Sequence, residues 1–266
     1  MPVRPLYVAT VLALIVPATA TAQDRFEYAA STGQYRVSSA TKATQEAMGQ
    51  KQDFESSNLQ LLTVTVARAS KDTTILTIVI DSISIVAPMG MVPPGMEKLK
   101  NSKITAKITP YGMPYSVVGP TDDSIPNATQ ITDDMSRFLP RIKTRLAAGA
   151  AWTDTITGKV KQGGLELDRR VVAKYTVVGD TTVNGEKSWK IARESATTSS
   201  GSGTAQGQAM SLEGTANGKA TLVVSQKGVF LGSANSEQAT AKITVAASGL
   251  EITVVTNTTA SIEKLR

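Results

Sequence analysis

Residues 62–67 read LTVTVA, and residues 76–85 read LTIVIDSISI. In the first stretch every second residue is bulky and apolar, beginning at Leu62, and the residues between are Thr or Ala. Because successive side chains of a β-strand point to opposite faces, this alternation predicts a half-buried strand. In the second stretch the apolar series ends at Ile80 and resumes out of phase at Ile83, which predicts a β-bulge or bend near Asp81.

The same alternation recurs along the chain and predicts a mainly β fold. Further strand signals fall at residues 103–108, 115–118, 171–177, 188–191, 220–224, 239–245 and 250–255. Asn184-Gly185 is the strongest hairpin signal, because a two-residue turn requires positive φ angles. Residues 195–208 are rich in Ser, Thr, Gly and Gln, which indicates a mobile loop or a long polar hairpin tip, with Gly201 and Gly203 in a flexible loop.

One segment has a helical pattern instead. Thr132 is a suitable N-cap, Asp133 and Asp134 follow it at the positive end of the helix dipole, and apolar residues then repeat at helical spacing. Pro140 removes one backbone donor, so we expect a kink or two short helices.

The expected fold class is therefore mainly β, with antiparallel curved sheets in two related halves and one central helix. The halves are expected to be related because residues 103–119 and 219–232 share an order of strand, glycine turn and short apolar strand. The expected domains are a signal peptide (1–22), an N-terminal β half (23–130) with a Pro/Met-rich loop (87–102), a helical connector (131–149) and a C-terminal β half (150–266).

The N-terminal segment has the parts of a cleavable secretory signal. Arg4 supplies the positive charge, residues 6–16 are apolar, and Ala20 and Ala22 form a small-residue cleavage site. No later run reaches the roughly 18 apolar residues that a membrane-spanning helix needs. We expect cleavage after Ala22, a periplasmic or secreted protein and no transmembrane span.

Composition removes several kinds of chemistry. The chain has no Cys, which excludes disulfides, thiolate metal sites and lipid attachment to a cysteine after the signal. It has no His, the usual general base and the commonest zinc ligand. Its net charge of +6 is not gathered into basic blocks interleaved with aromatic residues, so we expect no nucleic-acid partner.

The remaining catalytic signals are weak. Ser39 and Lys42 have the S-x-x-K spacing of serine acyl-enzymes, but they lie in a strand-like run without the partner motifs of that chemistry. The pairs Asp122-Asp123 and Asp133-Asp134 are explained by a turn and a helix start, since adjacent carboxylates rarely converge. We expect no catalytic residues, no bound metal and no cofactor.

Methionines form the one unusual cluster. Met89, Met91 and Met96 lie in the Pro/Met-rich loop, and Met113 follows nearby. Three interpretations are open: plain packing, a flexible flap over an apolar cavity, and a copper(I) site of thioether ligands. If the flap and helix enclose a cavity, the expected ligand-binding residues are Met89, Met91, Met96, Phe138, Ile142 and Trp152.

Four segments carry a family resemblance: Phe26 to Val37, Thr44 to Gln52 around Met48-Gly49, Leu139-Pro140 leading to Gly149 through Trp152, and Tyr175 to Ile191. In these segments the chain resembles a family of uncharacterised exported bacterial proteins grouped as a domain of unknown function. It departs from that pattern at Ala150-Ala151, where a polar residue would precede the tryptophan. The resemblance implies export and a β-rich fold and brings no catalytic residues, and the general shape is similar to periplasmic lipoprotein and lipid carriers.

These observations favour an exported, non-enzymatic binding or carrier protein of the bacterial envelope. The expected partner is an apolar small molecule or lipid, or an envelope protein. The alternative is a structural or protein-interaction module of the cell surface, which needs no enclosed pocket.

Overall fold

The computed structural model describes residues 25–87, 92, 94–120, 125, 128–162, 164–205 and 207–265, with backbone alone at 161, 162 and 205. The predicted signal peptide (1–22) lies outside these residues, and so do Met89 and Met91 of the predicted loop. In the described part of the chain, no helix is long and apolar enough to cross a membrane.

The described strands form one antiparallel sheet, and the mainly β fold is confirmed, with one α-helix among the described residues. The strands are β1 (Ser31–Ala47), β2 (Gln50–Arg68), β3 (Thr74–Val86), β4 (Lys103–Ile108), β5 (Pro114–Val118), β6 (Ala151–Gln162), β7 (Leu165–Val183), β8 (Glu186–Ala205), β9 (Gln208–Ser225), β10 (Phe230–Val245) and β11 (Leu250–Lys264). The two predicted halves share this sheet, because β1 pairs with β11 at its centre. That the halves are related to each other stays a prediction.

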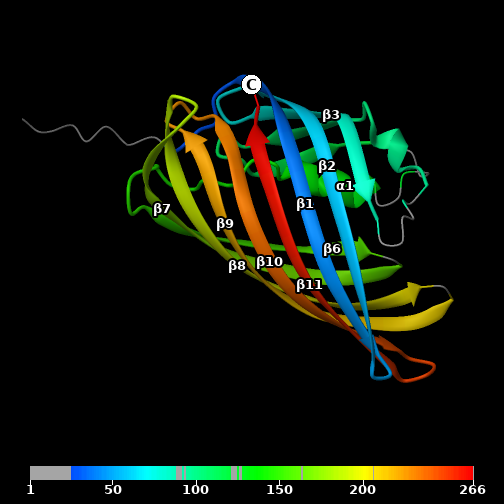
Figure 1. Ribbon diagram of the computed structural model, residues 1–266. Coiled ribbons are helices and arrows are strands. Elements are labelled where there is room, and N and C mark those ends of the chain that lie inside the picture. The colour runs from blue at the N-terminus through cyan, green and yellow to red at the C-terminus, as the bar shows by residue number, and fades with distance from the viewer. Residues whose placement is uncertain are drawn as a thin grey trace, which may run out of the picture.

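The strand order is β5-β4-β3-β2-β1-β11-β10-β9-β8-β7-β6, so each half is a meander and the sheet ends at β5 and β6. Between these two edges the chain passes through α1 (Ala128–Ser136) and then residues 137–150, which we call the crossing segment. Figure 1 shows a strongly curved sheet with α1 behind β1 to β3 in that view. The crossing segment therefore joins the two edges over the concave face.

Two predictions from local sequence are confirmed. Leu62 pairs with Ile80 and Leu61 with Ser82, so Asp81 is the extra residue of a β-bulge. The bulge lets Ile83, beyond it, pack against the same core as Ile80. Asn184 and Gly185 have φ angles of 50° and 79°, as a two-residue turn between β7 and β8 requires.

The polar stretch 195–208 forms the end of β8 and its turn into β9, in agreement with the hairpin interpretation. Gly201 and Gly203 lie within β8 and not in a flexible loop. A Cβ at Gly201 would collide with the carbonyl oxygen of Glu166 and lie 2.8 Å from Cα of Leu167 on β7. Glycine is therefore needed there for the close approach of the two strands.

The helix differs from the predicted connector 131–149, because α1 spans Ala128–Ser136 and the chain is not helical after Arg137. Pro140 cannot donate a backbone hydrogen bond and disfavours helical geometry just before it. Thr132 is consequently not an N-cap: it lies inside α1 and is buried. The apolar residues beyond α1 still reach the core, but from an irregular segment: Phe138, Leu139, Ile142 and Leu146.

Hydrogen bonds fix the crossing segment to the strands around it. The Ile142 amide donates to the Tyr111 carbonyl at 3.0 Å, and the Gly149 amide donates to the Val177 carbonyl at 2.9 Å. The Tyr28 hydroxyl donates to the Pro140 carbonyl at 2.7 Å.

The core occupies one end of the concave face. Its buried residues come from the beginning of β1, β8 and β10 and from the end of β2, β7 and β9, which adjoin one another in an antiparallel sheet. The opposite ends of these strands carry few core residues, and Figure 1 shows that β1, β2 and β10 continue far along the sheet. We call this second region the distal half of the sheet.

Candidate functional site: a groove on the concave face

Small side chains hollow the concave face beyond the core. The register places the inward-facing residues of β8, β9 and β10 in cross-strand rows, and most of them between the core and the distal half are small. They are Ser195, Thr197, Ser199, Gly214, Ala216, Gly218, Ala239 and Ala241. Because these residues fill little volume, space remains above the sheet.

Two adjoining cavities occupy this space. The proximal cavity, of about 330 Å³, lies against the crossing segment, and the distal cavity, of about 440 Å³, lies further along β8 to β10. Both are lined by Gln130, Val160, Arg169, Thr197 and Glu237. We call the two together the groove.

Aromatic rings form the core end of the proximal cavity. Phe138 contacts Phe230 edge-on, with ring centroids 5.6 Å apart, and Tyr35 edge-on at 5.2 Å. The Tyr35 hydroxyl donates to the Phe230 carbonyl at 2.7 Å. These contacts give the cavity a rigid apolar wall.

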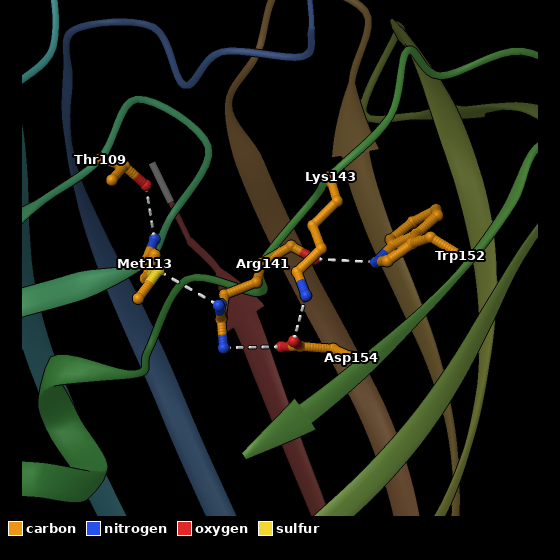
Figure 2. A network of polar contacts seen from close by, with 6 residues as sticks. All are labelled: Thr109, Met113, Arg141, Lys143, Trp152 and Asp154. Carbon is orange, nitrogen blue, oxygen red and sulfur yellow. Dashed lines mark hydrogen bonds and ion pairs between the residues drawn. The ribbon is translucent and has the colours of Figure 1, made fainter.

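A buried ion-pair cluster lies beside that wall (Figure 2). The carboxylate of Asp154, only 2% exposed, is 3.0 Å from Nη1 of Arg141 and 2.6 Å from Nζ of Lys143. Arg141 also donates from Nη2 to the sulfur of Met113 at 3.1 Å, and its carbonyl accepts from the Trp152 indole at 3.0 Å. The cluster thus ties β6 to the crossing segment.

Arg193 extends this cluster on the sheet side. It lies opposite Tyr175 in the β7–β8 register and lines the proximal cavity. Burial raises the pKa of Tyr175, while the positive charges of Arg193 and Arg141 oppose this shift and the Asp154 carboxylate adds to it. Both arginines and the carboxylate therefore lie within electrostatic range of one phenol.

The predicted ligand-binding residues lie in different parts of the structure, and only some of them line the groove. Phe138 lines the proximal cavity. Ile142 is fully buried in the core, and Trp152 stacks on Tyr175 with ring centroids 4.8 Å apart. Met96 belongs to the short 3₁₀ helix η2 (Met96–Leu99) and packs partly buried against the core, while Met89 and Met91 lie outside the described residues.

The charged residues of the groove were missed by sequence reasoning, although the sequence carries a signal for two of them. On β7, Arg169 falls in the inward apolar series between Leu167 and Val171, and on β6 Asp154 falls between Trp152 and Ile156. A charge on the apolar side of an alternating strand is costly unless it is paired or functional. Arg193 carries no such signal, since its Ser- and Thr-rich strand has no apolar side.

Within the described ranges, no group of three or more His, Cys, Asp or Glu side chains could hold a metal ion. Asp122 and Asp123 lie outside these ranges. Asp133 and Asp134 are exposed on α1, where Asp134 accepts a hydrogen bond from the Gln130 amide at 2.8 Å.

Comparison with known proteins gives no relative by sequence: no protein-family model matches the chain, and no curated protein matches it. Neisserial surface protein A is 11% identical, with 89% of this chain and 99% of that chain covered and a TM-score of 0.21. OccK2 of Pseudomonas aeruginosa is 6% identical, with 88% and 98% covered and a TM-score of 0.28. A DUF1329 family protein from Desulfovibrio piger is 10% identical, with 84% of each chain covered and a TM-score of 0.17.

These scores are too low to transfer a function, so the function is inferred from the groove itself. The resemblance to an exported β-rich family of unknown function stays a prediction.

Proposed function

We propose that this chain is an exported, non-enzymatic binding or carrier protein of the bacterial envelope that holds an apolar ligand in the groove. One observation carries the proposal: the concave face stays hollow beyond the core, where small side chains line it. In the distal part of β10 the inward residues are Ala239, Ala241 and Ile243, whereas the outward residues between them, Thr240 and Lys242, are polar.

A sheet with water on both faces has no reason to keep one face apolar. Inward-facing Leu212, Ile243 and Ile252 are only partly buried, so they offer apolar surface that a ligand could cover. Burial of such surface stabilises by about 25 cal/mol per Å². Each of the two cavities also falls within the range of roughly 300–1,000 Å³ that is typical of small-molecule sites.

The polar groups of the groove fit binding better than catalysis. Asp154 forms ion pairs with Arg141 and Lys143, so its carboxylate is already occupied and is not available as a general base. The predicted signal peptide supplies the envelope location, and this part of the proposal rests on the sequence.

Filling the distal cavity with a side chain tests the proposal. Ala239 lines that cavity, whereas Gln238 points to the opposite face. We expect Ala239→Phe to weaken binding of the methyl ester of cis-parinaric acid, a fluorescent fatty-acid ester, at least about tenfold, because losing two buried methylene contacts costs about 1.6 kcal/mol.

The matched control Gln238→Phe should bind like the wild type. Equal affinities for all three proteins in a fluorescence titration would place the ester elsewhere and contradict the proposal.

The alternative is a cell-surface structural or interaction module, and the edge of the sheet favours it. β6 pairs with β7 alone among the described strands, so the backbone groups on its other side are available to a partner strand. This module predicts that the wild type binds no apolar probe at all.

A further inference from the structure

Resting on the proposed binding function, we propose that the ligand is an anionic amphiphile. Its carboxylate or phosphate headgroup binds Arg193 and Arg141 in the proximal cavity, and its acyl chain lies along the small residues toward the distal cavity.

Unsatisfied donors mark the headgroup position. The Nε atoms of Arg193 and Arg141 are both buried and have no hydrogen-bond partner among the described residues. Both side chains line the proximal cavity. A buried donor without an acceptor costs about 1–3 kcal/mol, so a rotation of either guanidinium that brings its N–H groups to an acceptor on a ligand would recover that cost.

The charged side chains that line the proximal cavity leave a small positive excess, with five cations against four acids: Arg137, Arg141, Lys159, Arg169 and Arg193 against Asp133, Asp134, Asp154 and Glu237. The buried carboxylate of Asp154 contacts Arg141 and Lys143, whereas Arg193 acts with them only through its charge on the neighbouring Tyr175 phenol. Arg193 has no ion pair in the part of the chain that the structure describes. Guanidinium groups bind carboxylates and phosphates in a two-pronged geometry, which makes Arg193 suitable for either headgroup.

Three further acidic residues line the proximal cavity beside Arg193: Glu237, Asp133 and Asp134. Glu237 is one row further along, where its Oε2 lies 3.5 Å from the Cβ position of Gly218. Asp133 and Asp134 of α1 also line the proximal cavity, and Asp134 accepts a hydrogen bond from the Gln130 amide at 2.8 Å. Neither set forms an ion pair with Arg193, so its charge is available to a ligand.

The rest of the groove suits a chain. Gly201 follows Arg193 by eight residues on β8, which corresponds to a length of about 26 Å at about 3.3 Å per residue. Along that path the inward side chains of β8 and β9 are small, and the path ends beside Leu167 and Leu212 in the distal cavity. Arg169 flanks the path but is exposed, so its guanidinium can stay in water while its stem lines the groove.

The test compares two ligands that differ only at the headgroup, cis-parinaric acid and its methyl ester, each titrated by fluorescence into the chain from residue 23 onward. We expect the wild type to bind the acid at least about tenfold more tightly than the ester, since a hydrogen-bonded ion pair is made only by the acid. Arg193→Gln should reduce this preference to about threefold or less. Arg170→Gln, on the outward face of β7, is the matched control and should keep the preference.

Each result decides between defined outcomes. Equal binding of acid and ester by the wild type overturns the anionic headgroup while the proposed function stands, and absence of binding of both ligands overturns the proposed function itself. Loss of preference in Arg169→Gln but not in Arg193→Gln overturns the proposed headgroup position.

Inorganic phosphate alone separates a lipid headgroup from a free anion. If phosphate raises the melting temperature of the wild type but not of Arg193→Gln, and acid and ester bind equally, the site binds a free anion and the amphiphile is overturned. Circular dichroism of each variant confirms that the sheet is intact.

Discussion

Two buried tyrosines join distant parts of the chain through their hydroxyl groups. Tyr28 donates to the Pro140 carbonyl of the crossing segment, and Tyr35 donates to the Phe230 carbonyl at the start of β10. Burial raises the pKa of both phenols above the ordinary value of 10.0. Each phenol therefore remains neutral in the folded protein at a pH where it ionises in the unfolded chain.

This shift predicts a pH-dependent effect of Tyr35→Phe. At pH 8 the variant should be less stable than the wild type by about 1 kcal/mol, because the hydrogen bond to Phe230 is lost. As the pH rises above 10, the unfolded wild type releases the Tyr35 proton while the folded state keeps it, so this tyrosine's contribution to stability falls. At pH 11 that loss is about 1.4 kcal/mol, which should bring the two proteins close to equal stability.

Urea unfolding at pH 8 and pH 11 measures the difference directly. An equal difference in stability between wild type and Tyr35→Phe at both pH values would show that the fold does not shield the Tyr35 hydroxyl from ionisation.

At the scale of elements, the sequence predicted what local rules determine. Alternation gave the strand pattern and the bulge at Asp81, and Asn184-Gly185 gave the hairpin, because pleat and positive φ act within a few residues. The pairing of β1 with β11 joins the two ends of the described chain, and no local pattern specifies such a register.

The candidate site was predicted less well, because it depends on long-range placement. Phe138 was expected to line a cavity, and it does, but it does so from the crossing segment and not from a helix. Ile142 was placed on a helix that was expected to continue past Pro140. The helix ends before Pro140, and Ile142 is buried in the core instead. Arg193 enters the groove only through the register of β8 with β7, which its Ser- and Thr-rich neighbours do not reveal.

The close approach of β7 and β8 gives a prediction for one glycine. Gly201→Ala should lower the free energy of unfolding by about 1–3 kcal/mol, because the added methyl group collides with the backbone of Glu166 and Leu167 and the strands must separate. Ser202→Ala, at the adjacent exposed position, is the matched control and should change stability little. Urea unfolding of both variants checks this, and an equal effect of the two would contradict the close packing.

For the whole molecule, the central feature is a curved sheet that is only half covered. The crossing segment and the core occupy one end of the concave face, and the distal half continues with small or apolar inward side chains on β9 and β10. The ion pairs of Asp154 hold the crossing segment against β6, so the covered end is fixed while the groove beside it stays hollow. This division of the sheet between a core and a groove is what the carrier proposal requires.

Native mass spectrometry of the protein, purified without denaturation from the cells that produce it, tests this proposal most directly. A carried ligand predicts a fraction of molecules heavier than the polypeptide by the mass of one lipid, and solvent extraction should release an amphiphile of that mass. A clean spectrum at the mass of the polypeptide alone, from protein purified in this way, would contradict the account.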